Sequence, residues 1–418
     1  SLTGRHFWDD LPFLFFDGPE CRRARLLVYR TILHLFCEHY SKPLYEWCER
    51  NNLEHTGHYN AEDTLSGQLL NHCGGVMAHY RYQQLPGIDH LCRQTDPMLL
   101  TVKQASSAAR QLGRRGVLTE IFGVSHHTNT FEDFKWIGDY DLVLGATFFC
   151  PHLTWYSMRG KRKRDYPPNW NYQQTYWEHL RPLNDYFTRI SAVLSAGKPQ
   201  VEIVFLHPVE AASAALRRSV LTGKRPLGGL PGPDLGQVNE LDRIFRSLLE
   251  AALNAGYDAD LADEDYLATL GAVEGKRLRV GQMSYAVAVV PEAPTWRRTT
   301  FDLLKKLAAA GGKVIITGKP PVELDCESAE HAWAELTQMD NVLCIPASRK
   351  ELQDALDKVV RQRFRLRGAD GKPQPHLYVQ HRRDRGQDFF FIVNSDRAAG
   401  RRLRLTVFRA AGKQAALW

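Results

Sequence analysis

The chain has 418 residues, of which 44% are hydrophobic, 11% aromatic and 24% charged, as is typical of globular proteins rather than disordered, collagen-like or disulfide-scaffold chains. At roughly 150 residues per domain, this length predicts about three domains. The net charge of +7 is small and is spread over several clusters, so no nucleic-acid partner is predicted. No apolar run approaches the roughly 20 residues that span a bilayer, so no membrane partner is predicted.

The first predicted domain, residues 1–198, is a partial (β/α) barrel. Residues 19–51 have the spacing of one long helix that bends near Pro43, and residues 172–197 predict another amphipathic helix. Between them, short apolar runs alternate with helix-like segments, which is typical of parallel βα units. The predicted strands are residues 54–59, 76–82, 116–122 and 142–150.

The second predicted domain, residues 199–365, is a doubly wound, flavodoxin-like α/β domain. Residues 366–418 then change to short alternating runs, which predict antiparallel strands and the start of a β-sandwich. The chain opens at Ser1 rather than Met and ends directly after a strand-like run, so we expect both ends to be cut. The predicted strands of these two regions are residues 201–206, 257–261, 286–290, 313–317, 376–380, 388–394 and 402–409, and the predicted helices are residues 237–255 and 296–310.

Carboxylates, histidines and aromatic residues follow the predicted barrel strands. Loops after the strands of a βα barrel gather at one face, where active sites form. Aromatic faces and paired carboxylates suit a sugar, and glycoside hydrolysis needs two carboxyl groups. The candidate pair is Glu62 and Glu120, although a helix cap at Asn60 or Asp63 and a buried ion pair at Glu120 are the structural alternatives. The candidate substrate-binding residues are His58, Asp63, His79, Tyr80, Asp89, His127, His152 and Trp155.

Competing chemistries have weaker support. The sequence contains no glycine-rich phosphate cradle and no GxSxG elbow. His55, His58 and Glu62 do not have the spacing of a zinc motif. The basic run Lys161 to Arg164 offers contacts to phosphate, but we interpret it as a solvated or structural loop.

Several motifs together resemble one family, the bacterial α-L-rhamnosidases of glycoside hydrolase family 106. They are HTGHYNAED, AHYRYQQLPGIDHL, LTEIFG, HLTWYSMRGKRKRDYPP, YWEHLRPLNDYFTRISAVLSAGKP and VEIVFLHPVEAA. The resemblance implies a (β/α)8 TIM barrel, an amidotransferase-like α/β domain without glutaminase chemistry and β-sandwich domains. It also implies an inverting hydrolase acting on terminal rhamnose of a polysaccharide, with calcium assisting sugar binding in some members.

By the same resemblance, Glu62 and Glu120 line the pocket, and His58, His79, Tyr80, Asp89, His152 and Trp155 contact the sugar. The chain departs from the family pattern because the earlier barrel strands, one of which supplies a pocket carboxylate, have no counterpart here. We therefore expect that the N-terminal half of the barrel is missing, and four parallel strands alone cannot close a barrel.

We expect a glycoside hydrolase that binds a carbohydrate substrate. The alternatives are a β-galactosidase-like hydrolase and a non-catalytic carbohydrate-binding remnant. The residues indicate no certain cofactor and leave the metal ligands unknown, although the resemblance allows calcium. They leave open a homo-oligomer, and a cytoplasmic, periplasmic or extracellular location of a soluble protein.

Overall fold

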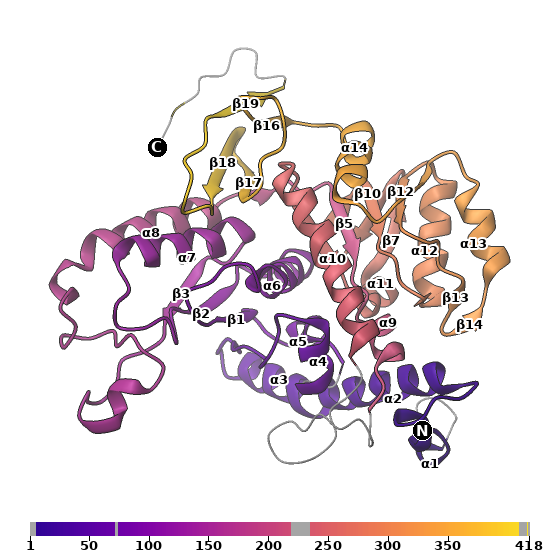
Figure 1. Ribbon diagram of the computed structural model, residues 1–418, viewed down its shortest axis with the longest axis horizontal. Helices are drawn as coiled ribbons and strands as arrows, with labels where there is room; N and C mark the ends of the chain where they lie inside the picture. Colours follow the sequence, from indigo (N-terminus) through magenta and orange to yellow (C-terminus); the bar gives the residue numbers. More distant parts are fainter. Residues whose placement is uncertain (1–5, 72–73, 219–234, 409–415, 417–418) are drawn as a thin grey trace.

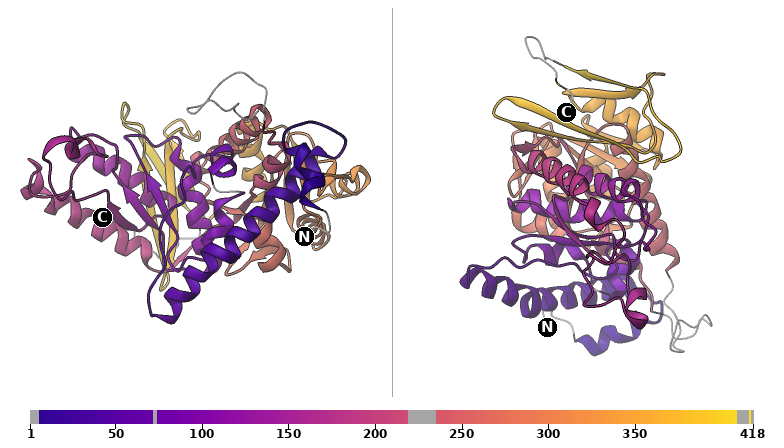
Figure 2. Two further views of the ribbon diagram at one scale, coloured as in Figure 1. Left: turned by 90° about the horizontal axis from the view of Figure 1, so that it is seen from below. Right: turned by 90° about the vertical axis from the view of Figure 1, so that its left-hand side faces the viewer.

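The computed structural model describes residues 6–71, 74–218, 235–408 and 416. A long helical segment opens the described chain and runs across both α/β units (Figures 1 and 2). From Cys21 to Arg50 it has nearly the predicted extent, and a π-helical turn that ends at Ser41, two residues before Pro43, interrupts it. The elements are α1 (Phe7–Asp10), the 3-10 turn η1 (Leu11–Leu14), α2 (Cys21–Phe36), the π turn η2 (Cys37–Ser41) and α3 (Lys42–Arg50).

The first α/β unit contains a parallel sheet of three strands, in the order β1-β2-β3. Among the described strands, β1 and β3 pair only with β2, so this sheet is open at both edges. The bounds are α4 (Leu65–Asn71), α5 (Val76–Tyr80), β1 (Gly87–His90), α6 (Met98–Leu112), β2 (Leu118–Ile121), α7 (Phe131–Leu144), β3 (Phe148–Pro151), η3 (Gly160–Arg164), η4 (Trp177–His179) and α8 (Arg181–Ser195).

Two of the four strands predicted for this unit are wrong. Residues 54–59 form no strand, and the run beginning at Val76 is the buried helix α5, because a short apolar run does not distinguish a strand from a buried helix. The prediction missed β1, whose sequence GIDH has only one β-branched residue. The third predicted strand is confirmed as β2, while the fourth begins only at Phe148 because Leu142 still belongs to α7.

The second unit is a parallel sheet of five strands in the order β15-β12-β10-β5-β6. Its first two strands in the chain are β5 and β6, and the next three follow on the other side of β5, which is the order of a flavodoxin-like sheet. Its bounds are β5 (Ile203–Leu206), α9 (Val209–Ala215), α10 (Gly236–Asn254), β6 (Ala259–Ala262), α11 (Glu264–Leu270), β10 (Val287–Val290), α12 (Arg298–Ala309), β12 (Lys313–Thr317), α13 (Glu330–Thr337), β15 (Val342–Ile345) and α14 (Arg349–Val359).

Small ladders complete the fold, and all of them are antiparallel except the short parallel pair of β11 and β13. The predicted C-terminal runs do form antiparallel strands, and β4, at the predicted domain boundary, pairs with β17 of this region. The bounds are β4 (Lys198–Pro199), β7 (Gly271–Glu274), β8 (Arg277–Val280), β9 (Met283–Tyr285), β11 (Thr295–Trp296), β13 (Glu323–Leu324), β14 (Glu327–Ser328), β16 (Phe364–Gly368), β17 (Leu377–Asp384), β18 (Gln387–Asn394) and β19 (Leu403–Val407).

Helix α6 lies between the two units (Figure 1). Its apolar residues belong to one buried cluster that also contains β5, β6 and β10. Lys103 and Arg110 of α6 form a buried ion network with Asp258 and Asp260 of the second unit. The units therefore share one core and one set of buried charges. In the described parts of the chain, no helix has the length and apolar character needed to cross a membrane.

Candidate functional site

The imidazole of His58 lies at the centre of a cluster of three carboxylates. Its Nε2 atom is 3.6 Å from Oε2 of Glu120 and 3.9 Å from Oδ2 of Asp89, and its Nδ1 atom is 4.0 Å from Oε1 of Glu62. The other oxygen of Glu120, Oε1, is 3.6 Å from Nε2 of His152. The structure thus brings five of the predicted site residues together, and we call them the His58 cluster.

Parallel pairing of β1 and β2 places two of these carboxylates side by side. Asp89 and Glu120 are direct partners in the register of the two strands. Neighbouring strands lie roughly 4.8 Å apart, and register partners have side chains on the same face of the sheet. Both carboxylates stand near the carboxyl ends of their strands, where active sites of βα folds form.

The segment that carries His58 lies directly on β1. The side chain of Gln83 donates to the carbonyl oxygen of Gly57 at 2.8 Å and accepts from the backbone N–H of Gly87 at 3.1 Å. A Cβ atom on Gly87 would lie 2.6 Å from the carbonyl oxygen of Gly57. Glycine at this position therefore permits the close approach that brings His58 over the strand ends.

Asp89 has the chemistry of a proton donor at mildly acidic pH. Burial raises its pKa to about 6, with the charge of His58 opposing the rise and that of Glu120 adding to it. Its Oδ1 atom is buried and has no hydrogen-bond partner among the described residues. Two adjacent carboxyl groups in different environments are a common way to provide one acid and one base.

Glu62 lies behind His58 and is buried, with a side chain that is 3% exposed. Its Oε1 accepts from the backbone N–H of Tyr59, and its Oε2 accepts from the hydroxyl of Tyr80 at 3.1 Å. Burial raises the pKa of Glu62 well above its usual range, and these two hydrogen bonds only partly oppose the rise. Glu62 is therefore suited to hold a proton and to fix the orientation of His58.

His79 and Tyr80 lie beneath the His58 cluster, on α5, and both are fully buried. The Nδ1 atom of His79 is 2.9 Å from Oγ of Ser41, and the ring of Tyr59 stacks on the imidazole with 4.6 Å between centroids. The structure does not bring these two predicted sugar contacts to the surface of the site. They instead support the segment that carries His58 and Glu62.

His127 and Trp155 form a separate pair beside the cluster, with ring centroids 5.5 Å apart. The ring of Trp155 is mostly buried, while His127 is half-buried. Asp63 is also half-buried, and its charge is a minor contributor to the raised pKa of Glu62, after burial. Among the described residues, Glu120 forms its ion contacts with His58 and His152 and not with these three predicted substrate-binding residues.

The sequence reasoning missed Tyr166 as a residue of the site. Its ring is about half exposed and lies 5.7 Å, centroid to centroid, from the ring of His152. An aromatic residue at the rim offers a face on which a sugar ring can stack. The only signal in the sequence is its position between the basic run Lys161 to Arg164 and the pair Pro167-Pro168.

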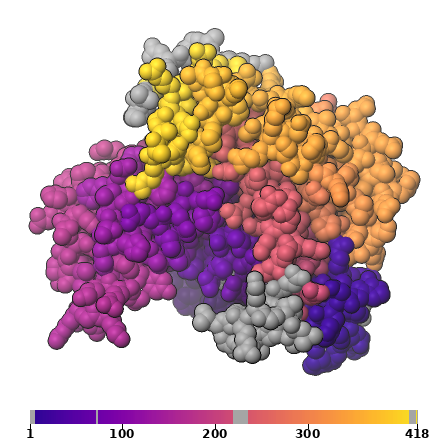
Figure 3. All heavy atoms as spheres, in the orientation of Figure 1, coloured from indigo at the N-terminus to yellow at the C-terminus, as the bar shows by residue number. Residues whose placement is uncertain are grey.

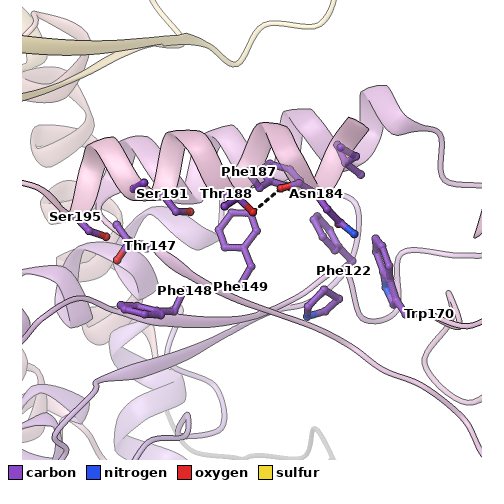
Figure 4. Close-up of a pocket in the computed structure, with 13 residues that line it drawn as sticks. Phe122, Thr147, Phe148, Phe149, Trp170, Asn184, Phe187, Thr188, Ser191 and Ser195 are labelled. Carbon is purple, nitrogen blue, oxygen red and sulfur yellow. Dashed lines mark hydrogen bonds between the residues drawn. The ribbon is translucent and has the colours of Figure 1, made fainter. Parts of the chain in front are cut away.

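An apolar pocket of about 590 Å³ lies elsewhere, between β3 and α8 (Figure 4). None of its lining residues carries an ionisable side chain. The pocket can therefore accept apolar atoms but supplies no acid or base, and the His58 cluster remains the candidate for chemistry. Its lining includes Phe122, Phe148, Phe149, Trp170, Leu183, Asn184 and Phe187.

The crevice at the carboxyl ends of the second sheet is closed by ion pairs. Doubly wound sheets bind ligands where the strand order reverses, which here is between β5 and β10. Glu210, after β5, pairs there with Arg30 of α2 and Arg297. Burial would raise the pKa of Glu210, but the Arg297 and Arg30 guanidiniums lower it to about 2. This part of the second unit is occupied by the protein's own charges.

The calcium that the resemblance allows has no recognisable site in the part of the chain that the structure describes. No group of three or more His, Cys, Asp or Glu side chains there has an arrangement that could hold a metal ion. The carboxylates of the His58 cluster contact histidine nitrogens instead. We therefore derive no step through a metal.

Comparison with known proteins identifies similar folds. No protein-family model and no curated protein matches the chain. A rhamnosidase from Novosphingobium sp. PP1Y is 19% identical with a TM-score of 0.62, over 90% of this chain and 34% of that one. A GH42 β-galactosidase from G. stearothermophilus is 11% identical with a TM-score of 0.62, over 91% of this chain and 64% of the other. An exo-carrageenase GH42 from Bacteroides ovatus is 12% identical with a TM-score of 0.56, over 94% and 54%.

This chain thus has a fold found in glycoside hydrolase structures, and it spans between about one third and two thirds of the length of these three proteins. At such low identity the comparison establishes the fold alone. The mixed α/β architecture with parallel sheets agrees with the expected fold class.

Proposed function

We propose that the protein is a glycoside hydrolase that removes a terminal sugar from a polysaccharide, with an α-L-rhamnoside as the first candidate substrate. The observation that carries this proposal is the His58 cluster, in which Asp89 and Glu120 stand side by side at the carboxyl ends of β1 and β2. The motifs that resemble family 106 favour rhamnose over other sugars, and a rhamnosidase is among the proteins that share the fold. β-Galactoside is the alternative substrate, since GH42 β-galactosidases share the fold equally well.

In this proposal Glu120 is the carboxylate that acts on the sugar or on the attacking water. Its side chain is 31% exposed, which makes it the most accessible carboxylate of the cluster. His58 and His152 contact different oxygens of Glu120 and hold its carboxyl group in place. A positioned carboxylate of this kind typically accelerates a reaction by roughly 10²- to 10⁴-fold.

Two residues compete for the role of the second carboxyl group. Asp89 is adjacent to Glu120 and partly accessible, whereas Glu62 is buried on the opposite side of the His58 ring. We propose Asp89 as the proton donor and Glu62 as a positioning residue for His58. Carboxyl groups about 5 Å apart act with retention, whereas groups about 6.5 to 9.5 Å apart act with inversion. A retaining reaction would support Asp89 and Glu120 as the catalytic pair. An inverting reaction would support Glu62 and Glu120, which is the pair predicted from the sequence.

The test is hydrolysis of a panel of aryl glycosides, led by the α-L-rhamnoside, by the protein and by its Glu120→Gln variant. The matched control is Glu351→Gln, which removes an exposed carboxylate on α14. We expect the Glu120 variant to lose at least about 10²-fold in kcat/KM while it still binds the sugar, and the control to keep full activity. Sugar binding without turnover by the unaltered protein would refute the hydrolase proposal in favour of a carbohydrate-binding remnant.

A further inference from the structure

The long segment between β3 and α8, which we call the excursion, carries an exposed basic cluster. The 3-10 turn η3 holds Lys161, Arg162, Lys163 and Arg164 in succession, and all four side chains are exposed. Within the described residues, none of the four forms an ion pair with a carboxylate. The excursion projects from the lower left of the molecule (Figures 1 and 3). Its positive charge is therefore available to a partner in solution.

Hydrogen bonds attach this excursion to the loop that follows Glu120. The carbonyl oxygen of Pro167 accepts from the backbone N–H groups of Ser125, at 2.9 Å, and His126, at 3.2 Å. His127 donates from Nε2 to the carbonyl oxygen of Lys163 at 2.7 Å. The Nδ1 atom of His127 is 2.9 Å from the side-chain Nε2 of Gln174, so the imidazole bridges two parts of the excursion. The basic turn is thus fixed beside the site rather than loosely tethered.

Tyr166 connects the basic turn with the catalytic candidates. Its ring lies beside that of His152, which in turn contacts Glu120. Lys163 is three positions earlier in the chain, so its Cα atom is within about 11 Å of that of Tyr166. A sugar unit bound at Glu120 and stacked on Tyr166 would therefore have its neighbouring units beside the basic turn.

Building on the proposed function, we propose that the substrate is an anionic polysaccharide, whose carboxylate or sulfate groups bind the basic turn while the terminal sugar lies at Glu120. The charged carboxylate of Glu120 would repel an anionic chain unless cations compensate for it nearby. The four unpaired cations of the basic turn would add no electrostatic attraction to the binding of a neutral glycan. The turn would act as a subsite for the polymer and not as a catalytic group.

The test compares the unaltered protein with a variant that carries Lys161→Gln, Arg162→Gln, Lys163→Gln and Arg164→Gln. The matched control removes the same charge from exposed, unpaired positions of the second unit, as Lys319→Gln, Lys350→Gln, Lys358→Gln and Arg361→Gln. Binding is measured by calorimetry with polygalacturonate as the carboxylate probe, carrageenan as the sulfate probe and an uncharged galactan as the neutral probe.

We expect the basic-turn variant to bind at least one anionic probe roughly tenfold more weakly, since each exposed ion pair contributes modestly. The control variant and the neutral probe should show no such loss. The binding advantage should also shrink as salt rises, because the screening length falls from about 10 Å at 0.1 M to about 3 Å at 1 M. The probe that responds identifies the anionic group.

Hydrolysis separates this inference from the proposed function. If anionic chains are cleaved, the basic-turn variant should raise KM and leave kcat unchanged, and an aryl rhamnoside should be cleaved as before. Anion-dependent binding without any hydrolysis would support the subsite and refute the hydrolase. Equal binding by both variants, or equally tight binding of duplex DNA by the basic turn, would overturn the subsite proposal.

Discussion

Replacing Asp89 by Asn should stabilise the protein at neutral pH and weaken the proposed hydrolysis. Burial raises the pKa of Asp89 from an ordinary value of 3.8 to about 6. The folded state therefore binds this proton more tightly than the unfolded state does. The contribution of Asp89 to stability is greatest below pH 4, falls as the pH rises through 6, and is constant above that.

The magnitude follows from the size of the pKa difference. A rise of about two units corresponds to roughly 3 kcal/mol of lost stability above pH 6. Because the group is partly open to water, we reduce this figure to about 1 to 2 kcal/mol. Asn has nearly the same shape, does not titrate, and can donate to the oxygens of Glu120, so the variant should recover this free energy of unfolding.

Urea unfolding at pH 4.5 and at pH 7.5 measures the effect. The stability difference between Asp89→Asn and the unaltered protein should be small at pH 4.5 and about 1 to 2 kcal/mol in favour of the variant at pH 7.5. The control, Asp302→Asn on the exposed face of α12, should show the same small difference at both pH values. A stability difference for Asp89→Asn that does not change with pH would refute the reasoning.

Two further predictions concern the support of the site. Arg110→Met leaves Asp258 and Asp260 with only one buried cation, so urea unfolding should show a loss of roughly 3 to 5 kcal/mol, and a loss below 1 kcal/mol would contradict the buried network. Gly87→Ala forces a Cβ atom against the carbonyl oxygen of Gly57, so we expect a loss of about 1 to 3 kcal/mol together with weaker sugar binding. Unchanged sugar binding after this substitution would show that the segment before Glu62 does not rest on β1 as described.

The second unit could be predicted closely from sequence, whereas the first could not. β12 has the predicted bounds because its run KVIIT is dense in β-branched residues and ends at a glycine. In the first unit, the run VMAHY has apolar and aromatic residues at a strand-like density, yet it forms the buried helix α5, which lies beneath the His58 cluster. A segment that is buried on all sides lacks the alternation of apolar and polar residues by which a helix is distinguished from a strand.

The candidate site was partly predictable for a similar reason. Glu120 ends a clear apolar strand, so its place at the strand end follows from the sequence. The contacts of His58 do not, because they depend on how residues 54–63 cross over β1, a non-local packing. The burial of Glu62 and His79 depends on α2, η2 and α5 coming together, which local patterns do not encode.

The charges on α6 also constrain how this protein can change during evolution. A rearrangement that joined the first unit to a different doubly wound domain would bury Lys103 and Arg110 without Asp258 and Asp260 opposite them. Several kcal/mol for each unpaired ion would exceed the margin by which most domains are stable. The buried charges therefore favour inheritance of the two units as a pair, although the proposed hydrolysis would take place in only one of them.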